Sequence, residues 1–248
     1  MSNYNVFSIF YDDFTKDVKY KDRARYILKL FEKYDRKPSL MLDLACGTGN
    51  FSVEFSKSGI EVIGVDVSED MLSVANEKNT ELSIPVMYIC QSAEELELFG
   101  TVDGAVCLLD SLNHIVDYNS FKKAIKNVSL FLEPNRLFIF DLNTPYKHSK
   151  ILSDNSFKTR AGNTVCYWSN TYSPENNTIK VNLDFIERKG FFKKETHSEA
   201  FLERTFSDDE IAVALKEAKL ELLDVLGENT FNAPKPNSQR NIYITRRI

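Results

Sequence analysis

The sequence is poor in cysteine and glycine and has no long apolar run, and each shortage excludes a class of protein. Its four cysteines stand in different stretches without a Cys-x-x-Cys pair, which argues against a zinc ribbon or a disulfide framework and favours a reducing compartment. No stretch approaches the roughly 18 apolar residues of a membrane span, and the first residues lack the basic and apolar regions of a signal peptide. We therefore expect a cytoplasmic protein with no membrane partner and no metal.

An excess of positive charge is also missing. The formal net charge is −5 and the isoelectric point about 5.4, which argues against a broad phosphate-binding face and makes nucleic acid an unfavoured partner. The length of 248 residues and the 43% hydrophobic content suit one large globular domain, with or without an inserted subdomain.

Short apolar stretches alternate with helical patterns through residues 20–143. Five strands are expected, at residues 40–45, 60–66, 85–90, 102–109 and 136–142, and two more strand candidates close the chain. Strands that are nearly apolar throughout and separated by helices predict a parallel sheet covered on both faces. The fold class is α/β, a doubly wound, mainly parallel seven-stranded sheet.

The pattern changes to strict alternation near Thr144, where Ile179, Val181, Leu183 and Phe185 stand between polar residues. Period-two alternation with short turns predicts a small antiparallel sheet, inserted into the α/β domain as a lid. The chain then divides into an N-terminal helical cap (1–35), an α/β core (36–143), the inserted lid on the substrate side (144–206) and a return to the core (207–248).

The stretch "LMLDLACGTGNFS" (residues 40–52) places Gly47 and Gly49 directly after an apolar strand. Glycine lets a backbone approach a ligand, and the following helix offers free N–H groups; a tight structural turn is the alternative. Asp43 on the strand would repel a pyrophosphate and welcome a cation, and Ser52 breaks the dinucleotide fingerprint. Asp66, at the end of the next strand, can accept hydrogen bonds from both ribose hydroxyls or cap a helix.

Asp43-x-Ala45-x-Gly47-x-Gly49, with Asp66 followed by "VSEDML", resembles the class I S-adenosylmethionine-dependent methyltransferases. The resemblance covers about residues 38–143 and is greatest to small-molecule enzymes of the glycine N-methyltransferase-like and related bacterial types. It implies that S-adenosyl-L-methionine is the cofactor and that the cofactor contacts Asp43, Ala45, Gly47, Gly49, Asp66, Val67, Met71, Ser92, Ala93, Leu108, Tyr11, Tyr20 and Arg25.

The resemblance also implies roles for these residues. Asp43 would hold the methionine ammonium, Arg25 its carboxylate and Asp66 the ribose diol. Val67 or Met71 would lie against the adenine, and Tyr11 or Tyr20 would cover the methionine arm. Ser92 stands where an adenine-reading acid is usual, so Ser92 with the Ala93 backbone, or Glu94, would take that place.

The segment "LLDSLNHI" (residues 108–115) follows the fourth strand and in similar enzymes faces the methyl acceptor. The catalytic candidates are Asp110, His114 and Asn113. His114 can deprotonate or orient an acceptor near neutral pH, or be a loop histidine satisfied by a carbonyl; His148 and His197 are expected to be bystanders. Substrate contacts are expected from Tyr11, Ser111, Trp168, Tyr172 and Arg204.

The expected reaction is transfer of a methyl group to N or O of a small-molecule acceptor by in-line displacement. Such a reaction needs alignment and exclusion of water, and no covalent intermediate. The alternatives are a non-catalytic S-adenosylmethionine-binding partner protein, a nicotinamide-dependent oxidoreductase, and a tRNA or protein methyltransferase. Either a monomer or a homodimer is compatible with the sequence.

Overall fold

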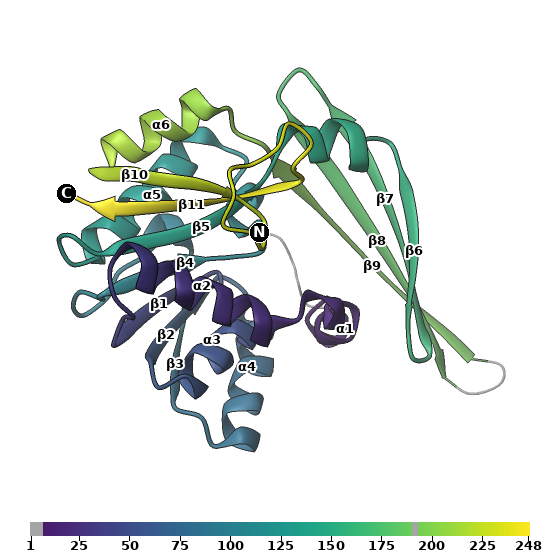
Figure 1. Ribbon diagram of the computed structural model, residues 1–248. Helices are drawn as coiled ribbons and strands as arrows, with labels where there is room; N and C mark the ends of the chain where they lie inside the picture. The colour runs from purple at the N-terminus through teal and green to yellow at the C-terminus, as the bar shows by residue number, and fades with distance from the viewer. Residues whose placement is uncertain (1–6, 190–192) are drawn as a thin grey trace.

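A seven-stranded sheet forms the centre of the protein in the computed structural model, which describes residues 7–189 and 193–248 (Figure 1). Its strand order is β10-β11-β5-β4-β1-β2-β3, and β11 runs antiparallel to both of its neighbours. The strands are β1 (Leu40–Leu44), β2 (Glu61–Asp66), β3 (Val86–Cys90), β4 (Gly104–Cys107), β5 (Leu137–Asn143), β10 (Leu220–Gly227) and β11 (Arg240–Arg247). The predicted fold class is confirmed.

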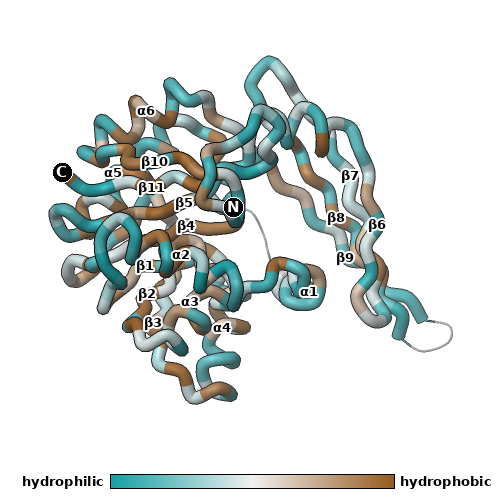
Figure 2. The backbone as a smooth tube through the Cα atoms, viewed as in Figure 1, coloured by the Kyte–Doolittle hydropathy of each residue, from teal (hydrophilic) through white to brown (hydrophobic). Residues whose placement is uncertain are grey.

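Helices cover both faces of this sheet because the central strands are apolar on both sides. They are α2 (Tyr20–Tyr34), α3 (Asn50–Lys57), α4 (Glu69–Leu82), α5 (Tyr118–Phe131) and α6 (Asp208–Glu217). One apolar cluster joins the sheet to α5 and α6, and a second joins it to α2 and α3; Figure 2 shows the apolar residues concentrated along the central strands. Among the described helices, none is long and apolar enough to cross a membrane.

A separate four-stranded antiparallel sheet lies between β5 and α6 in the chain and confirms the expected insertion. Its strands, in spatial order, are β6 (Ser156–Ala161), β7 (Thr164–Ser173), β8 (Thr178–Lys189) and β9 (Lys193–Arg204). The predicted lid (144–206) includes residues 190–192, which lie outside the described residues. The second sheet stands to one side of the large one (Figure 1).

Helix α1 (Phe7–Phe14) connects the two sheets. Phe10 stacks on Phe185 of β8, with ring centroids 5.0 Å apart. Asp12 accepts hydrogen bonds from Thr48 Oγ1 and Asn50 Nδ2, both at 2.7 Å. One side of α1 is therefore fixed to the second sheet, and the other to the turn that follows β1.

Candidate active site

A pocket opens at the carboxyl ends of β1 and β4, beside α1 and α2. The space within it and at its open mouth, solvent included, is about 320 Å³. Twelve residues line it: Tyr11, Tyr20, Asp43, Ala45, Cys46, Gly47, Thr48, Asn50, Phe51, Leu108, Leu109 and Ser111. Seven of the residues predicted from the sequence are among them: Tyr11, Tyr20, Asp43, Ala45, Gly47, Leu108 and Ser111.

The two glycines of the turn have positive φ angles but different surroundings. A Cβ atom added to Gly47 (φ +55°) would have no atom within 4 Å, so this backbone faces open space in the pocket. A Cβ on Gly49 (φ +73°) would lie 2.1 Å from Tyr88 Oη, and one on Gly64 would lie 2.5 Å from Tyr88 Cδ1. Of these glycines, only Gly47 therefore leaves room for a ligand. Gly49 and Gly64 have to be glycine because a side chain at either position would clash with the Tyr88 ring.

Asp43 projects from β1 and is buried beside the pocket. Ser52 Oγ donates a 2.5 Å hydrogen bond to Asp43 Oδ2, so the residue that breaks the dinucleotide fingerprint is a partner of this carboxyl group. Burial raises the pKa of Asp43 to about 7, with the nearby Asp66 charge adding to the effect. A cation bound at this place would favour the ionised form, as expected for the ammonium group of the methionine moiety.

Asp66 ends β2 and bonds to two backbone N–H groups. Its Oδ2 accepts from Gly47 N at 2.7 Å and its Oδ1 from Ser68 N at 2.9 Å. A carboxylate has about four acceptor sites, so both oxygens can still accept hydroxyl donors from a ribose. The capping alternative and the ribose role are therefore compatible, and burial raises the pKa of this carboxyl group from its ordinary value.

The residues expected around the adenine lie at the carboxyl ends of β2 and β3. Val67 is 56% exposed, whereas Met71 is only 4% exposed in α4; of the two, Val67 offers the accessible apolar surface. Ser92 and Ala93 follow β3, and both are half-buried. Their roles stay predictions.

The aromatic cover over the methionine end comes from α1 and α2. Tyr11 and Tyr20 both line the pocket, and Tyr20 Oη donates to Thr15 Oγ1 at 2.9 Å. Burial raises the pKa of each phenol, so both remain neutral. Arg25 lies elsewhere: its exposed side chain pairs with Asp22 at 3.3 Å, and it does not line the pocket.

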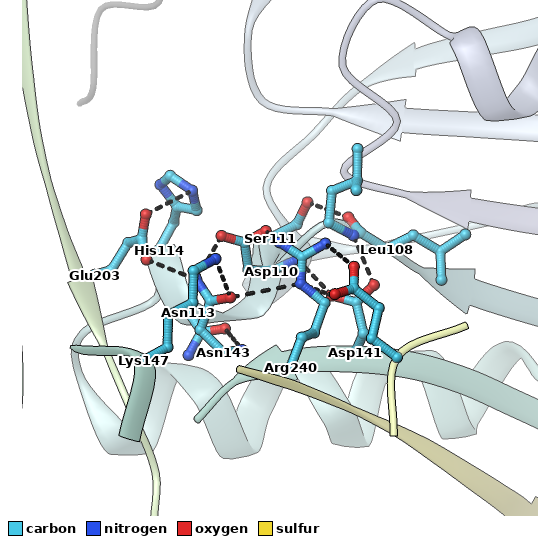
Figure 3. A network of polar contacts seen from close by, with 12 residues as sticks. Leu108, Asp110, Ser111, Asn113, His114, Asp141, Asn143, Lys147, Glu203 and Arg240 are labelled. Atoms are coloured by element: carbon cyan, nitrogen blue, oxygen red, sulfur yellow. Dashed lines mark hydrogen bonds and ion pairs between the residues drawn. The ribbon is translucent and has the colours of Figure 1, made fainter. Parts of the chain in front are cut away.

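The turn after β4 has an unfavourable backbone conformation, which hydrogen bonds to Asp141 of β5 stabilise. Leu109 and Asp110 have φ angles of +59° and +55°, the left-handed region that non-glycine residues rarely adopt. The Asp141 carboxylate accepts the N–H groups of Leu109 at 2.9 Å and of Asp110 at 2.5 Å (Figure 3). Asp141 thereby holds the segment that was predicted to face the acceptor.

Asp110 belongs to a buried ionic network. Arg240 of β11 forms an ion pair with Asp110 Oδ1, and Asn143 Nδ2 donates to its Oδ2 at 2.6 Å. Burial alone would raise the pKa of Asp110, but the charges of Arg240 and Lys147 bring it below its ordinary value. Asp110 is thus a fixed anion beside the pocket, suited to electrostatic stabilisation and not to taking up a proton.

Two residues predicted to touch the acceptor instead connect parts of the protein. Asn113 is fully buried; its Oδ1 accepts from Asn143 N at 2.9 Å and its Nδ2 donates to Arg204 O at 2.7 Å. The Arg204 guanidinium pairs with Glu210 at 2.5 Å and lies 5.1 Å from the Phe206 ring centroid. Neither side chain lines the pocket.

The remaining substrate candidates lie on the second sheet and in the turn. Ser111 Oγ donates to Leu108 O at 2.8 Å and lines the pocket. Trp168 is half-buried and donates from Nε1 to Asn170 Oδ1 at 2.5 Å. Tyr172 is half-buried as well, and its contact with substrate, like that of Trp168, stays a prediction.

His114 lies opposite a buried carboxylate that the sequence prediction missed. Glu203 of β9 is 5% exposed, and its Oε2 lies 3.1 Å from His148 Nε2 and accepts from Asn143 Nδ2 at 3.1 Å. Its Oε1 lies 3.9 Å from His114 Nε2 (Figure 3). His114 also contacts Phe201, with ring centroids 4.9 Å apart.

Comparison with known proteins indicates the class of enzyme to which this chain belongs. Residues 41–135 match the family described as "Methyltransferase domain". The chain is similar to an S-adenosylmethionine-dependent methyltransferase of Clostridium acetobutylicum ATCC 824, with a TM-score of 0.89, 29% identity and coverage of 98% of both chains. The protein is a class I S-adenosylmethionine-dependent methyltransferase.

Other matches agree over nearly the whole length of this methyltransferase. A Bacillus subtilis (strain 168) relative, "Putative methyltransferase YqeM", is 28% identical over 96% of this chain and 94% of its own. CalS10 of Micromonospora echinaspora, described as an amino pentose methyltransferase with bound S-adenosylmethionine, shares the fold at a TM-score of 0.78 and 16% identity over 98% of this chain and 97% of its own.

The residues of the methyltransferase fit its cofactor. The exposed backbone at Gly47 would accommodate the methionine arm, and the buried Asp43 carboxyl group would receive its ammonium. Asp66 stands one strand away with acceptor sites still available. The sequence prediction missed two acids near the pocket, Asp12 and Glu203. No sequence pattern marks Asp12, whereas strand alternation places Glu203 on the same face as the buried Ile179.

Proposed function

We propose that this methyltransferase transfers a methyl group to a nitrogen or oxygen atom of a small-molecule acceptor. The observation that carries the proposal is the position of the pocket beside α1: this helix contributes Tyr11 to the lining, lies between the two sheets (Figure 1), and is joined to the second sheet by the Phe10–Phe185 stack. An acceptor that enters such a space is enclosed on several sides, which suits a small molecule better than tRNA or a folded protein.

The side chains of the pocket have distinct parts in the proposed reaction. The cofactor supplies a methyl group on a positively charged sulfur atom. Asp43 and Asp66 bind and orient it, and Tyr11 and Tyr20 exclude water from the methionine end. Asp110, held as an anion by Arg240, contributes negative potential beside the reacting atoms. Alignment and dehydration are the main protein contributions to a displacement of this kind.

The names of two similar proteins support nitrogen and oxygen as candidate methyl-accepting atoms. The Ubiquinone biosynthesis O-methyltransferase of Coxiella burnetii is 30% identical over 43% of this chain and 45% of its own. The sugar N-methyltransferase KedS8 of Streptoalloteichus shares the fold at a TM-score of 0.78 and 16% identity. We extend neither substrate to this chain; together they support a small-molecule N or O acceptor.

The same proposal includes the surroundings in which the enzyme acts. A cytoplasmic location is supported by the four cysteines, all of which are free thiols. The net charge of −5 argues against nucleic acid as a partner. A monomer and a homodimer remain the two assemblies proposed.

The test is a screen for methyl uptake from S-adenosylmethionine that carries a labelled methyl group, with amines, phenols, alcohols and carboxylic acids as acceptors. Labelled small-molecule product is expected with the wild-type chain, and less of it with Gly47→Ala when S-adenosylmethionine is limiting. Melting curves with S-adenosylmethionine and with NADH accompany the screen, and only the first ligand should raise the melting temperature. Label found only in added tRNA or protein would contradict the small-molecule assignment.

A further inference from the structure

Charged residues are segregated between the two faces of the four-stranded sheet. Side chains alternate along a strand, and the pairing of β6 to β9 runs without a shift of register. The inner face is the one that carries Phe185 of β8 and that contacts α1. The outer face carries five exposed basic residues: Lys158, Arg160, Lys180, Arg188 and Lys194.

The inner face is free of basic residues along most of its length. On β9 its residues are His197, Glu199, Phe201 and Glu203. Over residues 164–172 of β7, 179–185 of β8 and 197–203 of β9, no inner-face position is lysine or arginine. Near the tip of the sheet, Lys189 and Lys193 neutralise Glu195.

This face borders the acceptor side of the pocket. Phe185 packs on α1, which carries Tyr11, and Phe201 contacts His114 in the short 3-10 helix Ser111–His114. Tyr11 and Ser111 both line the pocket. Ser111 at the start of this short helix lines the pocket, and His114 at its end lies 3.9 Å from Glu203 Oε1, so Glu203 is one short helix away from the pocket.

Glu203 is a buried acid of this face that has no described lysine or arginine at ion-pair distance; the Arg240 charge acts on it from farther away. Arg240 is paired with Asp110, Asp141 and Glu228. Among the described residues, no lysine or arginine nitrogen lies within 4.0 Å of the Glu203 carboxylate, whose Oε1 accepts no hydrogen bond (Figure 3). A buried carboxylate is costly unless a cation or donors compensate it.

Aromatic rings stand beside this carboxylate. The His114 and Phe201 rings are 4.9 Å apart, and both are only partly buried. A cation gains from contact with aromatic faces as well as from the carboxylate. An anionic acceptor would instead meet Glu203, Glu199 and the fixed Asp110 anion, and would be repelled.

We infer that the acceptor is an amine, which binds as its ammonium form on Glu203 Oε1 next to Phe201 and His114. The inference rests on the proposed function and narrows it from N or O to N. Before transfer, the ammonium releases one proton to the Glu203–His114 pair. The freed nitrogen lone pair then forms the new carbon–nitrogen bond, while the carbon–sulfur bond breaks and its electron pair remains on sulfur.

The test compares three probes on one scaffold: cyclohexylamine, cyclohexanol and cyclohexanecarboxylate. Each is titrated into the full chain saturated with S-adenosylhomocysteine, and the ring signals of the three histidines are followed by NMR. The amine should shift the His114 and His148 signals and leave His197, which is paired with Phe185 further along the sheet, nearly unchanged. Equal or tighter binding of the alcohol or the carboxylate overturns the inference, as does no binding of any probe.

Variants connect the preference to Glu203. Glu203→Gln keeps the size of the side chain and should weaken amine binding at least about tenfold, the loss expected for one charge-assisted bond. Asp184→Asn is the matched control, because it removes a carboxylate from the exposed outer face of β8. Unchanged amine binding by Glu203→Gln also overturns the inference.

The proposed function is tested separately in the same samples. S-adenosylmethionine and S-adenosylhomocysteine should raise the melting temperature of the wild-type chain and of both variants. Failure of these ligands to bind the wild-type chain would contradict the proposed function. Normal ligand binding without an amine preference would overturn only the amine assignment.

Discussion

Replacing Gly47 and Gly49 separately by alanine tests whether the two glycines of the turn have different roles. Both residues have positive φ angles, of +55° and +73°, and a side chain in this region costs roughly 1–2 kcal/mol. In Gly49→Ala the new Cβ would also lie 2.1 Å from Tyr88 Oη, and overpacking of this kind adds about 1–3 kcal/mol. Gly47→Ala adds no such contact, since its Cβ has no neighbour within 4 Å.

These energies convert into separate expectations for stability and for binding. For a chain of this size 1 kcal/mol corresponds to about 2–4 °C. Thermal unfolding should therefore show a loss of about 2–8 °C for Gly47→Ala and about 4–20 °C for Gly49→Ala. Calorimetry should show the opposite order for the cofactor, because the Cβ of Gly47 points into the pocket: we expect Gly47→Ala to weaken S-adenosylmethionine binding at least about tenfold.

A double variant identifies the cause of the Gly49 effect. Tyr88→Leu removes the hydroxyl and shortens the side chain, so Gly49→Ala should be less destabilising in that background, with a coupling of about 0.5–3 kcal/mol. Additive losses would mean that Tyr88 is not the obstacle. If Gly47→Ala keeps full affinity for the cofactor, the assignment of its open backbone to the methionine arm is wrong.

Four further changes separate binding from structural roles. Burial raises the pKa of Asp43 to about 7, so without ligand its carboxyl group is mostly neutral at pH 6 and mostly ionised at pH 8. An ammonium group requires the ionised form. The rise in melting temperature caused by S-adenosylmethionine should therefore be larger at pH 8 than at pH 6 in the wild-type chain and equal at both in Asp43→Asn. Asp66→Ala should weaken the cofactor by about 1.5–3 kcal/mol, and unchanged affinity in calorimetry would remove Asp66 from the site. Asn113→Ala should lower the free energy of unfolding by about 1–3 kcal/mol through two lost buried hydrogen bonds, while calorimetry shows cofactor affinity unaltered. Asp110→Ala leaves the buried Arg240 with fewer partners and should cost about 3–5 kcal/mol in denaturant unfolding; a stable variant would argue against the buried ionic network.

The fold could be predicted because the spacing of apolar residues along the sequence indicates each strand and helix. Nearly apolar strands separated by helical patterns indicated a covered parallel sheet, and the alternation from Ile179 to Phe185 indicated the second sheet. Strand β6 was missed because its six residues show little apolar alternation: five of its side chains are exposed. A strand held by pairing with a neighbour, and not by a buried face, leaves little signal in the sequence.

The positions of the residues predicted for the cofactor followed more directly from the sequence than those of the residues predicted for the acceptor. Asp43, Gly47 and Asp66 lie at the ends of two adjacent parallel strands, and their positions follow from the strands themselves. The segment 108–115 folds back on itself, and its side chains turn in several directions. Sequence proximity placed Asn113 beside the acceptor, but in the structure Asn113 is buried, and its Oδ1 and Nδ2 each make a hydrogen bond, which together join β5 to β9.

Glu203 shows how the missing part could have been found. Its position on the inner face follows from counting by twos from Phe185, whose register partner is His197, to Glu199, Phe201 and Glu203. Alternation was used to find apolar positions, yet the same count identifies the acids on the buried face. An acid on that face requires a compensating partner. In this protein the partners of Glu203 are an amide and two histidines, and that incomplete compensation is the feature from which an amine acceptor follows.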